Sequence, residues 1–141
     1  MTNHVAATWV QGMRFMVATG SGHALVVDNA HHQDGAAAGP MELVLAATAC
    51  CTGMDVVSIL DKMRQKLERL EIGVEGLRRE EEPRVYTEVV IVYRAWGEID
   101  PEKLLRSVSL SETKYCSVVA MLKPSVKVLF RAELNGAPVS L

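Results

Sequence analysis

Hydrophobic, β-favouring residues interrupted by short polar breaks fill the first part of the chain, which is typical of β-strands. From His4 to Asp28 the breaks fall at Gln11-Gly12 and at Gly20-Ser21-Gly22, which suit turns. The pattern therefore predicts a three-stranded meander, followed by an exposed loop over residues 29–39. The predicted strands are Val5–Val10, Phe15–Thr19 and Leu25–Val27.

A long helix is predicted next. Pro40 suits a first helical turn, and from Met41 to about Lys66 the residues are strong helix formers without a second proline. The first half of this segment is apolar nearly all round, so we expect it to be buried on every side. The second half, from Asp61 onward, has a polar face.

The rest of the chain switches between the two-residue period of β-strands and the 3.6-residue period of α-helices. We expect a hairpin with a turn at residues 80–83, a helix capped by Asp100 that runs to about Thr113, a short helix, and a last strand. This order predicts an α+β fold with a largely antiparallel sheet, built as a single domain over residues 1–141. The strands are expected at Leu70–Glu75, Val85–Trp96 and Val126–Leu134, and the short helix at Cys116–Leu122.

Charge and composition narrow the class of partner. The formal net charge is −2, from 15 basic and 17 acidic residues scattered along the sequence. No basic stripe suggests nucleic acid and no polybasic cluster suggests a membrane surface. Met1–Val10 lacks the pattern of a secretory signal, and we expect no segment to approach the roughly 20 apolar residues of a membrane span. A cytoplasmic protein that binds small molecules or other proteins is expected.

The three cysteines admit two interpretations. An odd number argues against a disulfide framework. Free cysteine is among the most buried residue types, so Cys50 and Cys51 can be inert core residues. Cys116 starts the short predicted helix, where unpaired N–H groups would stabilise a thiolate and lower the thiol pKa.

Metal binding is the competing chemistry for these thiols. No C-x-x-C or H-E-x-x-H pattern occurs, and adjacent residues such as Cys50 and Cys51 project about 100° apart on a helix. We therefore expect neither a metal nor another cofactor. The remaining candidate metal ligands are His4, His23, His31 and His32.

Several motifs resemble one known family. The segment Gly39–Ala47 leads into Cys51-Thr52-Gly53 and Asp55-Val56-Val57, and a second thiol lies in Lys114–Val118. These motifs, spread over most of the chain, resemble the osmotically inducible protein C and organic hydroperoxide resistance (OsmC/Ohr) proteins, especially their YhfA-like branch.

The resemblance implies an OsmC-like fold in the form of an intertwined homodimer, with the two long helices crossing at its centre. The residues themselves are compatible with this arrangement, because small side chains allow two helix backbones to approach closely. The small residues of the helix are Ala46, Ala47, Ala49, Cys50 and Gly53.

The resemblance also implies a dithiol peroxidase. The Cys51 thiolate would attack an organic hydroperoxide and become a sulfenic acid, which Cys116 would convert into a disulfide. A dithiol reductant, commonly a lipoylated protein in the family, would reopen it. No prosthetic group is implied.

Well-characterised members of the family hold the thiolate with a glutamate and an arginine. That glutamate lies ten residues before the reactive cysteine, where this chain has Met41, and the acid is Glu42. Glu42 and Arg14 are therefore candidates for the pair. The alternatives are an acid that complements the helix dipole and an arginine at a solvated strand end.

Helical geometry favours Cys51 over Cys50 as the reactive thiol. Cys51 shares a face with Val44, Ala47, Thr48, Met54 and Asp55, whereas Cys50 shares one with Leu43, Ala46, Gly53 and Val57. The Cys50 face has smaller residues and is expected to pack against a neighbouring backbone. The alternative function is a non-catalytic dimeric module that binds a small hydrophobic ligand where its long helices cross.

Overall fold

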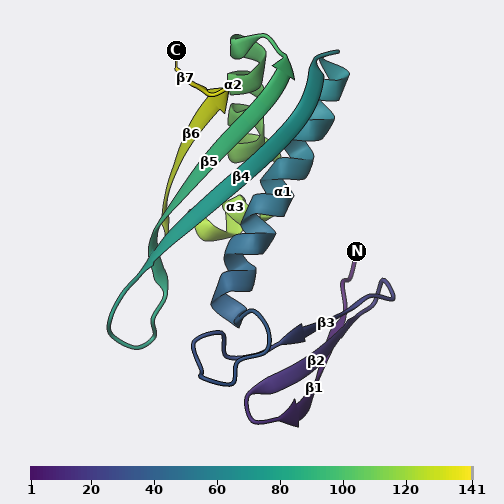
Figure 1. Cartoon of the computed structure of the whole chain (residues 1–141), viewed down its shortest axis with the longest axis vertical. Coiled ribbons are helices and arrows are strands. Elements are labelled where there is room, and N and C mark those ends of the chain that lie inside the picture. The colour runs from purple at the N-terminus through teal and green to yellow at the C-terminus, as the bar shows by residue number, and fades with distance from the viewer. Residues whose placement is uncertain (141) are drawn as a thin grey trace. The chain divides into compact units, whose positions relative to one another are not determined.

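The computed structural model describes residues 1–140 and divides into two compact units. The N-terminal unit is Met1–Val44, and the C-terminal unit begins at Leu45. The long helix starts in the first unit and continues through the second (Figure 1).

The N-terminal unit is the predicted meander. Strands β1 (Val5–Gln11), β2 (Arg14–Thr19) and β3 (Ala24–Val27) pair in sequence order, and both pairs are antiparallel. Large apolar side chains on these strands stay exposed, among them Trp9 at 63%. Within its own residues this unit therefore has little core.

Helix α1 (Pro40–Lys62) ends four residues earlier than predicted. Arg64 has a φ of 58°, a left-handed conformation that stops the helix. The Arg64 N–H donates to the Asp61 carbonyl and the Gln65 N–H to the Leu60 carbonyl, which is the Schellman arrangement of a helix C-terminus. The next strand begins directly at Lys66.

The C-terminal unit has a four-stranded sheet in the order β4-β5-β6-β7. Strands β4 (Lys66–Arg78) and β5 (Tyr86–Glu98) form the predicted hairpin, whereas β5 and β6 (Lys127–Leu134) are parallel. The helical connection between β5 and β6 permits the parallel pairing. Strand β7 (Ala137–Val139), which was not predicted, pairs antiparallel with β6.

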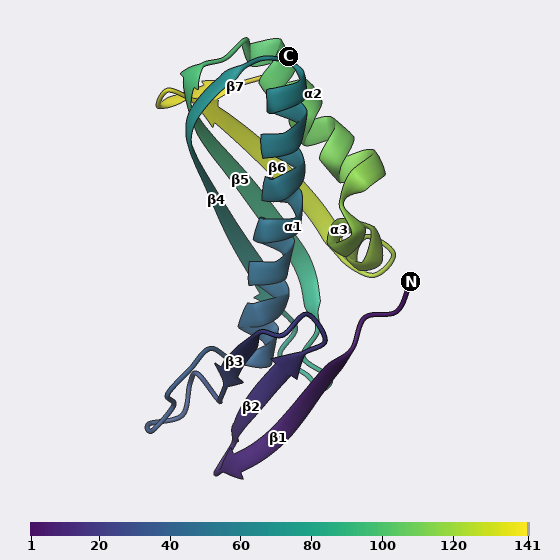
Figure 2. The same cartoon turned by 90° about the vertical axis from the view of Figure 1, so that its right-hand side faces the viewer.

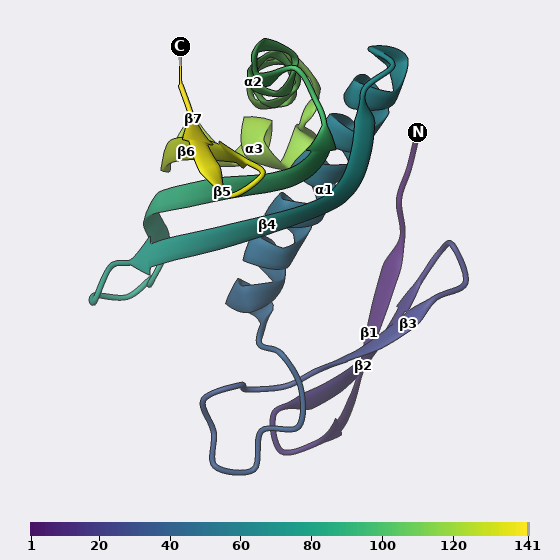
Figure 3. The same ribbon diagram turned by 45° about the horizontal axis from the view of Figure 1, so that its top comes forward.

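Three helices cover one face of this sheet (Figures 2 and 3). They are α1, α2 (Pro101–Leu110) and α3 (Ser117–Leu122), with a π-helical segment η1 (Ser111–Tyr115) between α2 and α3. As predicted, Asp100 caps α2 by accepting from the Glu102 N–H at 2.9 Å. The fully buried core includes Val56, Leu60, Val89, Ile91, Tyr93, Leu104, Val108 and Val119.

Only one side of α1 is buried within the chain. The expectation of burial all round is wrong, because Met54 is 71% and Val57 48% exposed. Gly53 faces inward, where an added Cβ would meet Ile72 Cδ1 of β4 at 2.8 Å, so its small size serves packing within the chain.

By length and composition α1 also reaches the limit for a membrane span, contrary to the sequence expectation, although core helices of soluble proteins do the same.

A glycine near the end of β5 permits the bulge in the β4–β5 hairpin. Gly97 has a φ of 138°, and a Cβ there would lie 2.0 Å from the Lys66 carbonyl oxygen. The Asn135 side chain bonds both the N–H and the carbonyl of Gly97, each at 3.0 Å. No other residue type fits this backbone without displacing Lys66 or the Asn135 contacts.

We predict that Gly97→Ala lowers the free energy of unfolding by about 1–3 kcal/mol, the usual cost of such backbone strain. The matched control is Gly73→Ala in β4, where the nearest atom to an added Cβ is Arg94 Nη1 at 3.5 Å. Urea denaturation of both variants measures the difference. Equal stability of the two variants would contradict the prediction.

Candidate active site

The two predicted active thiols lie together in the C-terminal unit. Cys51 is half-buried in the middle of α1, and Cys116 is buried at the junction of η1 and α3. Cys51 is near enough to Cys116 to raise the pKa of its thiol, and both are free thiols. Two residues 65 positions apart (116 minus 51) are thus brought near each other by the packing of α1 against η1 and α3.

Cys116 is the N-cap of α3, and its Sγ accepts a hydrogen bond from the Val119 N–H at 3.4 Å. The sequence expectation of a lowered thiol pKa is nevertheless wrong. Burial, with a smaller contribution from the nearby Cys51, raises the pKa of Cys116 to about 11 against the opposing effect of the Val119 N–H. Cys116 therefore keeps its proton at neutral pH.

A π-helical segment sets the position of Cys116. Regular α-helix ends at Leu110, short of the predicted Thr113, and the Cys116 N–H donates to the Ser111 carbonyl at 2.8 Å, an i to i−5 bond. The wider turn directs the Ser111 and Glu112 side chains into the interior, where both are buried. Such segments frequently occur at functional sites.

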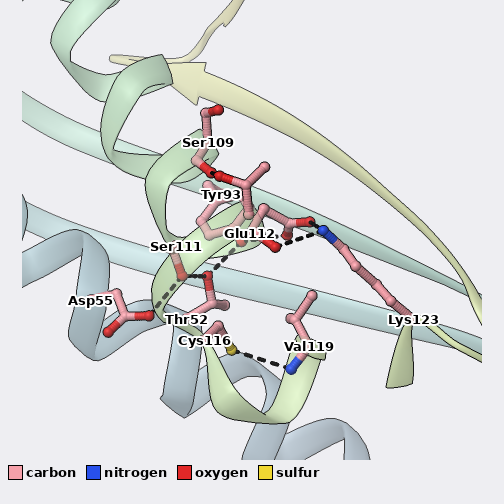
Figure 4. A network of polar contacts seen from close by, with 10 residues as sticks. Thr52, Asp55, Tyr93, Ser109, Ser111, Glu112, Cys116, Val119 and Lys123 are labelled. Atoms are coloured by element: carbon pink, nitrogen blue, oxygen red, sulfur yellow. Dashed lines mark hydrogen bonds and ion pairs between the residues drawn. The ribbon is translucent and has the colours of Figure 1, made fainter. Parts of the chain in front are cut away.

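A chain of hydrogen-bonded side chains connects α1, β5 and η1 beside the thiols (Figure 4). The Thr52 hydroxyl lies 2.6 Å from Tyr93 Oη and 2.7 Å from Ser111 Oγ. Ser111 donates to Asp55 Oδ2 at 2.9 Å, and Tyr93 Oη lies 3.0 Å from Glu112 Oε1. Since Thr52 directly follows Cys51, this chain fixes the helical turn that carries the first thiol.

Burial raises the pKa of two groups in this hydrogen-bonded chain, Glu112 and Tyr93. It raises the pKa of the Glu112 carboxyl, while the hydrogen bond from Tyr93 and the charge of Lys123 oppose the shift. Burial likewise raises the pKa of the Tyr93 phenol, with Thr52 opposing and Glu112 adding to the shift. Lys123 Nζ donates to the Glu112 backbone carbonyl at 2.6 Å and lies 4.0 Å from its carboxylate.

Sequence reasoning missed four members of this chain: Thr52, Tyr93, Ser111 and Glu112. The available signal was polarity in an apolar setting, since Thr52 interrupts the apolar half of α1 and Tyr93 lies in the middle of an apolar strand. That signal does not reveal the partners, which come from three separate elements.

Cys50 faces away from this site. Within the chain it is exposed and lines a shallow groove of about 460 Å³, together with Gly53, Met54, Val57, Ser58, Leu70 and Ile72. Met54, assigned from helical spacing to the Cys51 face, lies in this groove instead. The expectation that Cys50 packs against a neighbouring backbone stays a prediction.

Arg14 and Glu42 have other partners in the N-terminal unit. Arg14 Nε pairs with Asp28 Oδ2 at 3.0 Å, and Glu42 Oε1 accepts from the Gly39 N–H at 3.2 Å, as an acid in a first helical turn does. The backbone N–H groups of Ala36 and Asn29, followed by Arg14, lower the pKa of Asp28. A thiolate-activating role for Arg14 and Glu42 stays a prediction.

Among residues 1–140, no group of three or more His, Cys, Asp and Glu side chains is arranged to hold a metal ion. His31 and His32 lie in the loop between β3 and α1. His23 Nδ1 lies 3.1 Å from Ser21 Oγ in the turn between β2 and β3.

The fold and site define a class of protein: a mixed α+β chain with a long helix whose central cysteine faces a second cysteine from a later helix. The profile of the family described as OsmC-like protein matches residues 32–130, and the chain belongs to this family. It is 37% identical over 130 residues to protein YhfA of Escherichia coli K12, covering 92% of this chain and 96% of YhfA.

Solved structures agree with this assignment. A hypothetical protein from Aquifex aeolicus VF5 superposes with a TM-score of 0.86 at 34% identity, covering 96% of this chain and 97% of that one. The organic hydroperoxide resistance protein OhrB of Bacillus subtilis has a TM-score of 0.66 at 18% identity, covering 94% and 98%, which shows a shared fold.

Proposed function

We propose that this protein is a dithiol peroxidase that reduces organic hydroperoxides through Cys51 and Cys116. The observation that carries the proposal is that Cys51 lies beside Cys116, near enough to raise the pKa of the Cys116 thiol. Membership of the OsmC-like family supports it, as do related folds in proteins named for organic hydroperoxide resistance.

In the proposed reaction, the Cys51 thiolate attacks one peroxide oxygen and the O–O bond breaks. Cys51 becomes a sulfenic acid, and the alkoxide takes up a proton to leave as an alcohol. Cys116 then attacks the Cys51 sulfur, the S–O bond breaks, and the Cys116 proton leaves with the hydroxyl as water. A dithiol, such as a lipoylated protein, supplies two hydrogens to restore both thiols.

The exposure of the thiols supports these roles. Cys116 is only 2% exposed and keeps its proton at neutral pH, so it is poorly suited to meet a substrate from solution. Cys51 is only half-buried and lies near Cys116. Cys50 is exposed on another side of α1 and is not required by the mechanism.

Replacement of single cysteines tests the assignment. We expect Cys51→Ser to reduce hydroperoxide consumption to background and Cys50→Ser to retain it. Cys116→Ser should allow one turnover and then accumulate a sulfenic or sulfinic acid on Cys51, because the resolving thiol is absent. Peroxide consumption and intact mass measure these outcomes.

In the wild type, hydroperoxide should produce a loss of two hydrogens and a Cys51–Cys116 peptide link. A non-catalytic ligand-binding module has no reason to form that link. Full turnover by Cys51→Ser, or loss of turnover in folded Cys50→Ser, would show that another thiol reacts.

Organic hydroperoxides should react faster than hydrogen peroxide. No charged residue lies between Glu42 and Asp55, the stretch of α1 that contains Cys51, so an alkyl group meets mainly apolar surface. Burial of two methylenes at about 0.8 kcal/mol each gives a preference of about tenfold. Stopped-flow second-order rate constants for cumene hydroperoxide and hydrogen peroxide measure it, and equal values would contradict the prediction.

We further propose that the active form is a homodimer. Cys50, Met54 and Val57 line an apolar groove along α1, and the sheet of the N-terminal unit exposes Trp9, Met16 and other large apolar side chains. Exposed apolar surface of this extent is typical of interfaces. A second copy of the chain, as the family resemblance implies, would cover it.

Sedimentation velocity at micromolar concentration should therefore give a dimer. Val57→Asp should shift it toward monomer, because a carboxylate would be buried without a partner. Met121→Asp on α3, at a methionine that is 81% exposed, is the control and should remain dimeric. A folded wild-type monomer would refute the dimer.

A further inference from the structure

Glu112 is a buried acid that the cysteine chemistry does not use. Its side chain is 1% exposed, and it ends a chain of side chains that runs from Glu112 through Tyr93, Thr52 and Ser111 to Asp55 (Figure 4). The chain has four oxygen to oxygen contacts, of 3.0, 2.6, 2.7 and 2.9 Å in that order.

The protons in this chain can be counted. Each contact needs one proton between its two oxygens, and each hydroxyl supplies one. Tyr93, Thr52 and Ser111 therefore supply three protons for four contacts. If both carboxyls were ionised, Tyr93 would donate to Glu112 and Ser111 to Asp55, and the single Thr52 proton could serve only one of its two contacts.

The unserved contact would set two oxygen lone pairs against each other at 2.6 or 2.7 Å in the interior. Such an arrangement is unfavourable, because buried polar groups without a proton between them repel. One of the two carboxyls must therefore carry the fourth proton. Asp55 is partly exposed at the far end, whereas Glu112 is enclosed.

We propose that Glu112 is a protonated carboxylic acid in the resting protein and acts as a positioning residue for the Cys51–Cys116 pair. Its O–H donates to Tyr93, Tyr93 to Thr52, Thr52 to Ser111 and Ser111 to the Asp55 carboxylate, so all four bonds run in one direction. The chain then ties the turn after Cys51 to the segment that ends at Cys116.

The groups around Glu112 agree with this assignment. Burial raises the pKa of its carboxyl, and the two ionisable neighbours that act on it are Tyr93 from β5 and Lys123 after α3. The Lys123 ammonium is 40% exposed, lies 4.0 Å from the Glu112 carboxyl and has its short bond to the Glu112 backbone carbonyl. Its charge lowers the pKa of Glu112, but burial is the larger effect. Cys116 also affects these hydrogen-bonded side chains, because it raises the pKa of the Tyr93 phenol.

Deprotonation of Glu112 removes one of the four bonds. Because the folded-state pKa is raised, this happens as pH rises above the ordinary glutamate range and through the raised value. Thr52 then loses its bond to Tyr93 or to Ser111, and disulfide formation slows. This consequence rests on the proposed function, whereas the proton on Glu112 does not.

Infrared spectroscopy of the reduced full-length protein tests the protonation without any peroxide. At pH 7 we expect a carboxylic acid C=O band that shifts in D2O and is absent from Glu112→Gln. The absence of this band from the wild type, or its persistence in Glu112→Gln, overturns the proposal.

The pH profile of diamide-driven Cys51–Cys116 disulfide formation tests the positioning role. Glutamine keeps an N–H donor for Tyr93 at every pH, so wild type and Glu112→Gln should agree at low pH. Above the Glu112 pKa the wild type should become about five- to tenfold slower than the variant, the loss expected for one hydrogen bond. Identical profiles overturn the proposal.

The Thr113 hydroxyl donates to the Ser109 carbonyl in the same segment but takes no part in the hydrogen bonds between Glu112 and Asp55. Thr113→Val is therefore the matched control. It should follow the wild-type profile, and a profile like that of Glu112→Gln would overturn the specific role of Glu112. If hydroperoxide gives no disulfide while the infrared band and the diamide profiles are as expected, the peroxidase proposal fails and the assignment of Glu112 stands.

Discussion

The two hydrogen bonds of the Thr52 hydroxyl connect the elements on which the candidate site depends. Thr52 is fully buried and joins α1 to Tyr93 of β5 and to Ser111 of η1. Because it follows Cys51 in the sequence, its position fixes the direction in which the Cys51 side chain points. Its bond to Ser111 also holds the start of the π-helical segment that leads to Cys116. The Thr52 hydroxyl takes no part in the proposed reaction, yet its hydrogen bonds set the geometry of the two thiols.

Opposing electrostatic effects meet at Cys116. A helix N-terminus favours a thiolate, and the Val119 N–H does point at its sulfur. Burial nevertheless dominates, because α3 has only six residues and the thiol is almost fully enclosed. The two thiols are therefore unequal: one is enclosed and protonated, and the other is accessible. This inequality suits a pair in which one sulfur meets the oxidant and the other reacts with the product.

The chain also leaves large apolar side chains of α1 and of the N-terminal sheet exposed. Only 22% of the most apolar window of α1 is buried, and β1 is exposed along its whole length. Helix α1 is apolar on the side that faces β4 and on the side that carries Cys50. Within the chain, the sheet covers only the first of these sides. The uncovered side is the physical reason for proposing a second copy.

The sequence by itself predicted the order of the main elements, the N-terminal meander, the β4–β5 hairpin and the capped helix α2, and it proposed Cys51 and Cys116 as the candidate thiols. The elements follow from local periodicity, caps and turn residues. The two thiols follow from sequence motifs that resemble those of the family. The end of α1 at Lys62, the parallel pairing of β5 with β6, and the π segment were decided by tertiary structure. So was the raised pKa of Cys116, since burial depends on neighbours supplied by other elements. Tertiary structure also decided the hydrogen-bonded chain of Thr52, Tyr93, Ser111 and Glu112. Its members come from three elements, and only packing shows which hydroxyl bonds which carboxyl.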